Sequence, residues 1–139
     1  MDHQGLLRQL ETLALPEADF NHEAHLLAAW AYRRNYPARE AAARCSRTLS
    51  RYAMAKGAAH KYHHTLTMAA LAILYSRLDA RPELLDDWSA FLASCPDLKN
   101  DLPSLLRQHY SEEKLQDETA RKAFVEPDLK PLPDSDMLH

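Results

Sequence analysis

The shortage of glycine constrains the fold of this chain more than any other feature of its sequence. Only two of the 139 residues are glycine, and eight prolines separate long stretches rich in alanine and leucine. A sheet protein needs many tight turns, which depend on glycine, asparagine and aspartate at positive φ. The sequence therefore predicts an all-α protein, and we expect a compact helical bundle of five to seven helices.

Length and composition favour one domain followed by a short tail. A chain of this length is a usual size for a single domain and can bury about two-thirds of the surface that it exposes when unfolded. We expect a single helical domain over residues 1–125. Residues 126–139 read EPDLKPLPDSDMLH, a Pro- and Asp-rich segment that we expect to be an extended C-terminal tail.

Apolar periodicity and helix-stop residues predict where the helices lie. Pro37 suits the first turn of a third helix, and Gly57 suits the left-handed position that ends it. The fourth helix is apolar on most of its circumference, so we expect it to be the central element. The aromatic residues on apolar stripes are expected in the core: Trp30, Trp88, Phe91 and Phe124. The predicted ranges are about 2–14, 21–35, 37–56, 60–78 and 83–94, with shorter helices near 103–110 and 111–125.

The formal net charge of −3 hides an uneven distribution of charge. Residues 33–61 carry eight basic residues and one acidic residue, whereas residues 79–139 carry seven basic and fourteen acidic residues. A basic band can bind phosphate or nucleic acid. Such runs are more often a solvated face or the partner of an acidic part of the same chain. We therefore expect no nucleic-acid partner.

The sequence shows no export signal and no membrane span. Asp2 and His3 stand where a secretory signal would carry lysine or arginine. The longest apolar window, Thr67–Tyr75, is far shorter than the ~20 residues that cross a bilayer. We expect a cytoplasmic protein with no membrane partner. The sequence is compatible with a homodimer. Cys45 and Cys95 are expected to be buried thiols rather than a disulfide.

Five histidines fall at the predicted starts of two helices. The stretch FNHEAHLLAAW contains His22 and His25, and HKYHHTLT contains His60, His63 and His64. Short connections favour antiparallel neighbours, so the second and fourth helices should run parallel and start at the same end of the bundle. Residues three or four apart share a helix face. We therefore expect His22, His25 and His63 to converge.

A cluster of this kind suits a divalent transition metal, because neutral imidazoles from adjacent turns are good ligands for Zn, Fe, Cu, Ni or Mn. We predict His22, His25 and His63 as ligands, with His60 or His64 as the fourth. The stretch HEAH is one residue short of the zinc-protease motif HExxH and is not read as one. A metal-free functional cluster and ordinary capping or surface histidines are the alternatives.

The functional hypothesis is a metal-dependent enzyme or small-molecule binding protein that uses this histidine cluster. Thr65, Thr67 and Tyr52 are the candidate catalytic or ligand-orienting residues, and a small-molecule substrate is the expected partner. The alternative is a helical protein–protein interaction module without catalysis, a short solenoid-like scaffold. The stretch AWAYRRNYPAREAAARCSRTLSRYA has the small and aromatic spacing of a helix-turn-helix repeat, although the repeat consensus is absent.

Three stretches together resemble a family of small bacterial all-helical proteins without an assigned function. The stretches are FNHEAHLLAAW, KYHHTLT and DLKNDLPSLLRQHYSEEKLQDETARKAF, and the similarity spans most of the chain. The family pattern reads F-x-H-x-x-H and Y-H-x-T-x-T, with glutamate often in the place of His64. The resemblance implies that the matching residues act as a set, and it implies no activity. These residues are Phe20, His22, His25, Tyr62, His63, Thr65 and Thr67.

Overall fold

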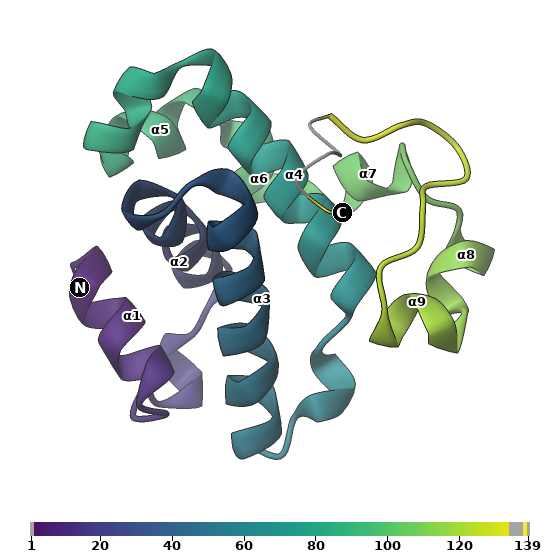
Figure 1. The fold of residues 1–139 in the computed structure, drawn as a ribbon, viewed down its shortest axis with the longest axis horizontal. Helices are drawn as coiled ribbons and strands as arrows, with labels where there is room; N and C mark the ends of the chain where they lie inside the picture. Colours follow the sequence, from purple (N-terminus) through teal and green to yellow (C-terminus); the bar gives the residue numbers. More distant parts are fainter. Residues whose placement is uncertain (1, 134–137, 139) are drawn as a thin grey trace. The chain divides into compact units, whose positions relative to one another are not determined.

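The chain is built of helices joined by turns (Figure 1). The computed structural model describes residues 2–133 and 138. Over these residues it contains nine α-helices, three 3-10 helices and no strand, which confirms the all-α prediction. The number of helices exceeds the five to seven expected, because the second half of the chain is divided into short pieces.

The chain divides into two compact units, residues 1–62 and residues 63–139, each with its own internal contacts. The boundary falls inside the range predicted as a single helical domain. The first unit contains α1 (His3–Glu11), η1 (Glu17–Asp19), α2 (His22–Asn35), α3 (Ala38–Ala55) and η2 (Ala59–Lys61). The second contains α4 (His64–Ala80), η3 (Pro82–Asp86), α5 (Trp88–Ser94), α6 (Pro96–Asn100), α7 (Leu102–Arg107), α8 (Glu112–Gln116) and α9 (Glu118–Lys122).

Three helices, α1, α2 and α3, contact one another in the first unit. Both α1 and α2 begin at a capping side chain, Asp2 and Asn21, whose oxygen accepts a backbone N–H three residues later. Trp30 on α2 is 2% exposed, as expected of a core residue. Cys45 on α3 is fully buried, and burial raises the pKa of its thiol to about 12. These residues form an apolar interior beneath the polar outer faces of the helices.

Two helices of the first unit end in a left-handed residue. Gly57 follows α3 with φ of 69°, and the next backbone N–H, that of Ala58, donates to Ala53 O at 2.7 Å. This confirms the predicted role of Gly57. Leu13 follows α1 with φ of 64°, a conformation that costs a residue with a side chain about 1–2 kcal/mol.

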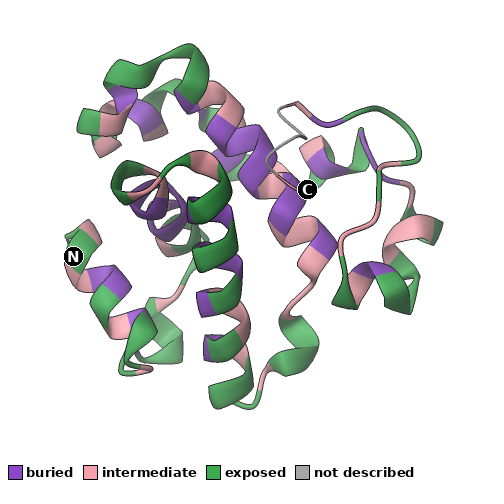
Figure 2. Cartoon of the chain, in the orientation of Figure 1, coloured by how far each residue is buried: buried purple, intermediate pink, exposed green. Residues whose placement is uncertain are grey.

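In the second unit, α4 lies among the other helices, as expected of an apolar fourth helix. Nine of its 17 residues are buried, and purple runs along most of its length in Figure 2. It contacts η3, α7 and α9. Among the aromatic residues predicted for the core, Phe91 on α5 is 1% exposed, whereas Trp88 and Phe124 are half-buried.

Two predicted helix boundaries are wrong for local reasons. The fourth helix begins at His64 rather than His60, because His63 is its capping residue and η2 forms a separate turn before it. The predicted helix over residues 83–94 is interrupted at Asp87, whose carboxylate caps the N-terminus of α5. The residues before this cap form η3 instead.

The end of the described chain is fixed against α7 and α8 rather than projecting from them. We call residues 125–133 the C-terminal strap, which follows α9 without helical structure. The backbone N–H of Leu129 donates to His109 O at 3.0 Å. Asp128 accepts the backbone N–H and the hydroxyl of Ser111, at 2.9 and 2.5 Å. The strap therefore has a defined register against the turn between α7 and α8.

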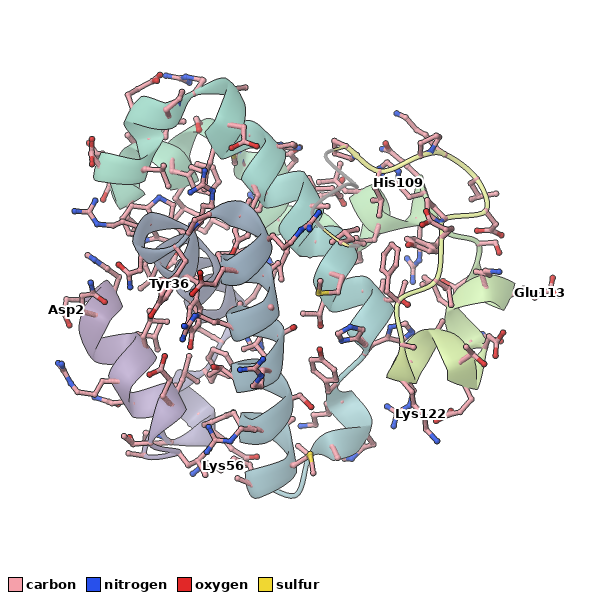
Figure 3. The ribbon with its side chains drawn as sticks, viewed as in Figure 1. Asp2, Tyr36, Lys56, His109, Glu113 and Lys122 are labelled. Atoms are coloured by element: carbon pink, nitrogen blue, oxygen red, sulfur yellow. The ribbon has the colours of Figure 1, made fainter. Side chains whose placement is uncertain are left out.

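Two further features hold the strap. His109, labelled in Figure 3, is 7% exposed, and its Nδ1–H donates to Lys130 O at 3.0 Å. Leu132 is 6% exposed, so the strap also buries an apolar side chain. The rest of the predicted tail, residues 134–137 and 139, lies outside the described residues.

Candidate functional site

The five predicted metal ligands are divided between the two units. His22 and His25 lie in the first turn of α2, and His60 lies in η2, all within the first unit. His63 and His64 lie at the start of α4 in the second unit. Over residues 2–133 and 138, no group of three or more histidine, cysteine, aspartate or glutamate side chains is placed to hold a metal ion.

Both ring nitrogens of His63 are engaged within the second unit. Nδ1 accepts the backbone N–H of Leu66 at 3.1 Å, which caps α4. Nε2 lies 3.0 Å from Leu115 O on α8, and because a carbonyl only accepts, Nε2 carries the proton. This neutral tautomer has no lone pair left for a metal. His63 therefore joins the start of α4 to α8 in this arrangement.

The three predicted catalytic hydroxyls are likewise used by the backbone. Tyr52 OH donates to Leu15 O at 2.6 Å, and Thr67 Oγ1 donates to His63 O at 2.8 Å. Thr65 is fully buried, and its hydroxyl donates to a carbonyl at the end of α9 and accepts the backbone N–H that opens the strap. Each hydroxyl satisfies a backbone group instead of lining a site.

His25 has the most distinctive setting of the histidines. Its ring stacks on Phe20, with centroids 3.7 Å apart, and its Nδ1 lies 2.8 Å from Asn21 O. The carbonyl must accept, so Nδ1 carries the proton and the lone pair is on Nε2. Burial by its neighbours lowers the pKa of His25, and His22 lowers it further. A neutral imidazole with a fixed tautomer results.

The fourth-ligand candidates do not extend this pair. His60 is exposed on η2. His64 is half-buried at the first position of α4, and burial followed by the proximity of His63 lowers its pKa. The motif F-x-H-x-x-H thus acquires a local explanation within the first unit, because its phenylalanine supports the ring of His25.

A polar cleft of about 480 Å³ lies in the first unit, away from the predicted histidines. Side chains of α1 and α2 line it, with Tyr36 beyond the end of α2 (labelled in Figure 3). A cleft of this size falls in the range of small-molecule sites. The lining residues are Gln4, Leu7, Arg8, Glu11, Tyr32, Asn35 and Tyr36.

A chain of hydrogen bonds runs from the core to the wall of this cleft. Tyr32 is 2% exposed, and its hydroxyl donates to Glu11 Oε1 at 2.7 Å. The same hydroxyl lies 2.7 Å from Thr48 Oγ1, which must be the donor because the tyrosine has only one proton to give. Burial raises the pKa of Tyr32. The tyrosine therefore remains a donor, and the chain points toward the carboxylate of Glu11.

The other polar residues that line the cleft come from α1, from α2 and from Tyr36, whose ring is covered by a side chain of α3. Gln4 and Asn35 exchange two amide hydrogen bonds, each of 3.2 Å, across α1 and α2. The Arg44 guanidinium lies over the ring of Tyr36, 4.2 Å from its centroid, and Arg44 Nε donates to Glu40 at 2.8 Å. Within the described residues, the side chain of Arg8 makes no hydrogen bond or ion pair.

Sequence reasoning missed this cleft because none of its residues belongs to a motif. Gln4, Arg8 and Glu11 have the spacing of an ordinary solvated face of α1. The available signal was a pair of tyrosines four residues apart, Tyr32 on α2 and Tyr36 just after it. A buried tyrosine would need a partner for its hydroxyl. That partner is 21 residues away in the chain, which no local pattern encodes.

A second cavity, of about 380 Å³, lies in the second unit between α4, α7 and the C-terminal strap. Arg77 at its edge donates to both carboxylate oxygens of Asp97, at 2.6 and 2.7 Å. This contact raises the pKa of Arg77 and lowers that of Asp97. The Arg77 guanidinium is thereby neutralised by a residue of the same unit, and Lys130 is a second cationic side chain among the described residues that line the cavity.

None of the helices in the described part of the chain is long and apolar enough to span a bilayer. Comparisons with protein-family models, with curated proteins and with solved structures found no match to this chain.

Proposed function

We propose that the protein binds a small polar molecule in the cleft of the first unit. The hydrogen-bond chain from Thr48 through Tyr32 to Glu11 carries this proposal. Ligand sites are concave, and a few oriented polar groups within them fix the ligand. The chain supplies such an orientation, because it holds one oxygen of the Glu11 carboxylate and leaves Oε2 without a hydrogen bond among the described residues.

A purely structural role accounts for this arrangement less well. A buried tyrosine hydroxyl needs a partner, and Thr48 alone would satisfy Tyr32. Drawing the exposed Glu11 into the chain adds a restrained carboxylate at the wall of the cleft. Restraint before binding lowers the entropic cost of forming a complex. The groups around the cleft therefore have the properties expected of a preorganised site.

The test is a titration followed by NMR, with a library of small polar molecules and the isotope-labelled protein. We expect at least one compound to shift the amide signals of Arg8, Glu11 and Tyr36. Glu11→Gln keeps an oxygen that can accept from Tyr32 but removes the charge, and we expect it to weaken binding about tenfold, the equivalent of ~1.4 kcal/mol. Glu17→Gln, in η1 outside the cleft, is the matched control.

Two results would contradict the proposal. One is a library in which no compound perturbs the cleft signals. The other is a compound whose affinity is the same for the Glu11→Gln variant, the Glu17→Gln variant and the parent protein.

A second candidate is a transition-metal site at His22 and His25, and the fixed tautomer of His25 favours it. Metal-bound histidines usually donate their second ring nitrogen to a carbonyl or carboxylate, as His25 donates to Asn21 O. Two side chains from adjacent turns would leave the remaining positions of a zinc ion to water or to a ligand.

Calorimetric titration of tag-free protein with zinc chloride tests this second site. We expect His25→Ala to weaken zinc binding about tenfold. His63→Asn should leave binding unchanged, because asparagine can still cap α4 and His63 offers no lone pair. An equal loss of zinc affinity in both variants would support the ligand set of His22, His25 and His63. Unchanged zinc affinity in His25→Ala would show that His25 does not bind the metal. The interaction-module alternative has no comparable supporting observation and stays a prediction.

A further inference from the structure

We infer that the ligand of the cleft is a zwitterion of the α-amino-acid class, which carries an ammonium and a carboxylate on the same carbon atom. This inference rests on the proposed function and adds the chemical class of the ligand. Its basis is the placement of one cationic and one anionic side chain, Arg8 and Glu11, on the same wall of one cleft.

Arg8 and Glu11 are three residues apart on α1 and therefore neighbours on its surface, separated by about 4.5 Å along the helix axis. Oppositely charged residues with this spacing can form an ion pair. Here they do not: the described structure gives the Glu11 side chain a hydrogen bond from Tyr32 and gives the Arg8 side chain neither a hydrogen bond nor an ion pair. The buried hydroxyl thus holds the carboxylate and leaves the two charges separate.

Each of these charges selects a different part of a ligand. A guanidinium binds a carboxylate through two parallel hydrogen bonds. The available oxygen of Glu11 accepts from an N–H donor, and an ammonium offers three. A ligand with both groups compensates both side chains, whereas a singly charged ligand leaves one of them without a counter-charge in the cleft.

The other groups of the cleft are compatible with a small zwitterion. The amide pair of Gln4 and Asn35 is joined by two long hydrogen bonds, each of 3.2 Å, and can exchange one of them for a bond to a ligand oxygen. Tyr36 forms an aromatic wall, and Arg44 covers its ring at 4.2 Å. Because Arg44 is paired with Glu40, it adds little net charge.

Two other ligand classes fit the cleft less well. A phosphate monoester carries about two negative charges, but Arg8 is the one cation that lines the cleft among the described residues, and Glu11 would repel the ligand. An apolar ligand would cover Glu11 and Arg8 without replacing their hydrogen bonds to water, which is costly. The mixture of charges therefore favours a ligand that is neutral overall and charged at both ends.

The experiment compares matched probes on the full chain. The standard L-amino acids are screened by NMR titration, and the tightest binder is compared with its deaminated and decarboxylated analogues; for L-alanine these are propionate and ethylamine. We expect the amino acid to bind at least about tenfold more tightly than either analogue. Loss of discrimination between the amino acid and one analogue would overturn the inference.

Two variants assign each charge to one end of the ligand. Arg8→Gln should weaken binding of the amino acid and of the carboxylate analogue about tenfold and leave binding of the amine analogue unchanged. Glu11→Gln should weaken binding of the amino acid and of the amine analogue about tenfold and leave binding of the carboxylate analogue unchanged. Arg51→Gln, an exposed position on α3 outside the cleft, is the control that should change none of them. Identical effects of a variant on both analogues would contradict the assignment.

The failure of this inference differs from the failure of the proposed function. If no amino acid binds but another small polar molecule perturbs the cleft signals, the zwitterion is wrong and the cleft remains a ligand site. If neither the amino acids nor the wider library perturbs these signals, both are wrong.

Discussion

Ending the chain at Phe124 is expected to destabilise the second unit by at least about 5 kcal/mol, because the C-terminal strap is then absent. At least six hydrogen bonds of the described residues disappear: those from Leu129, His109, Tyr110 and Val125, and the pair between Ser111 and Asp128. Each contributes about 0.5–1.5 kcal/mol, and the burial of Leu132 adds about 1.5–3 kcal/mol. Domains of this size are stable by only about 5–15 kcal/mol.

Urea unfolding followed by circular dichroism measures this effect. We expect the shortened chain to lose helical signal at a much lower urea concentration than the full chain. Leu129→Ala is the matched control within the strap, because this side chain is 59% exposed and its replacement should change stability by less than about 0.5 kcal/mol. Equal unfolding midpoints for the shortened and full chains would show that the strap does not hold the second unit.

Thr65→Val is expected to be the most destabilising conservative substitution at a predicted site residue, at about 2 kcal/mol. Valine has nearly the same shape but cannot bond to Ala123 O or to the N–H of Val125, which Thr65 contacts at 2.9 and 3.2 Å. Leaving a fully buried donor or acceptor without its hydrogen bond costs about 1–3 kcal/mol. The cost is near the lower end for each of these two backbone groups, because both hydrogen bonds are only partly buried. Both losses occur where α9 leads into the strap.

Thr65→Ser is the control for this substitution. Serine keeps the hydroxyl and removes one methyl group, so we expect a loss of about 0.8 kcal/mol. The free energies of unfolding of both variants come from urea titrations. A valine variant that is as stable as the parent protein would mean that the two hydrogen bonds contribute nothing to the stability of the second unit.

The all-α class could be predicted because it depends on local features of the chain. The scarcity of glycine and the apolar periodicity act over a few residues, and the end of α3 at Gly57 follows from the conformational freedom of that residue. The start of α4 could not be predicted in the same way. Histidine is not among the usual capping residues, and His63 caps this helix while also reaching Leu115, 52 residues away.

The candidate site shows the same division between local and distant interactions. The histidines were predicted to converge from the order of the helices. The orientation of each ring depends instead on a contact with an individual carbonyl, such as Asn21 O for His25. The cleft depends on contacts that join α1 to α2 and α2 to α3, at Glu11, Tyr32 and Thr48. Composition likewise predicted an extended segment after residue 125, whereas its attachment depends on the distant acceptor His109 O.

The division of the chain at residue 62 places one of its two tryptophans in each unit. Trp30 is buried in the first unit, and Trp88 is half-buried at the start of α5 in the second. The fluorescence of an indole changes when it becomes exposed to water, so a Trp88→Phe chain reports the first unit and a Trp30→Phe chain reports the second. Coincident transitions would identify one cooperative unfolding unit, and separate transitions would identify two.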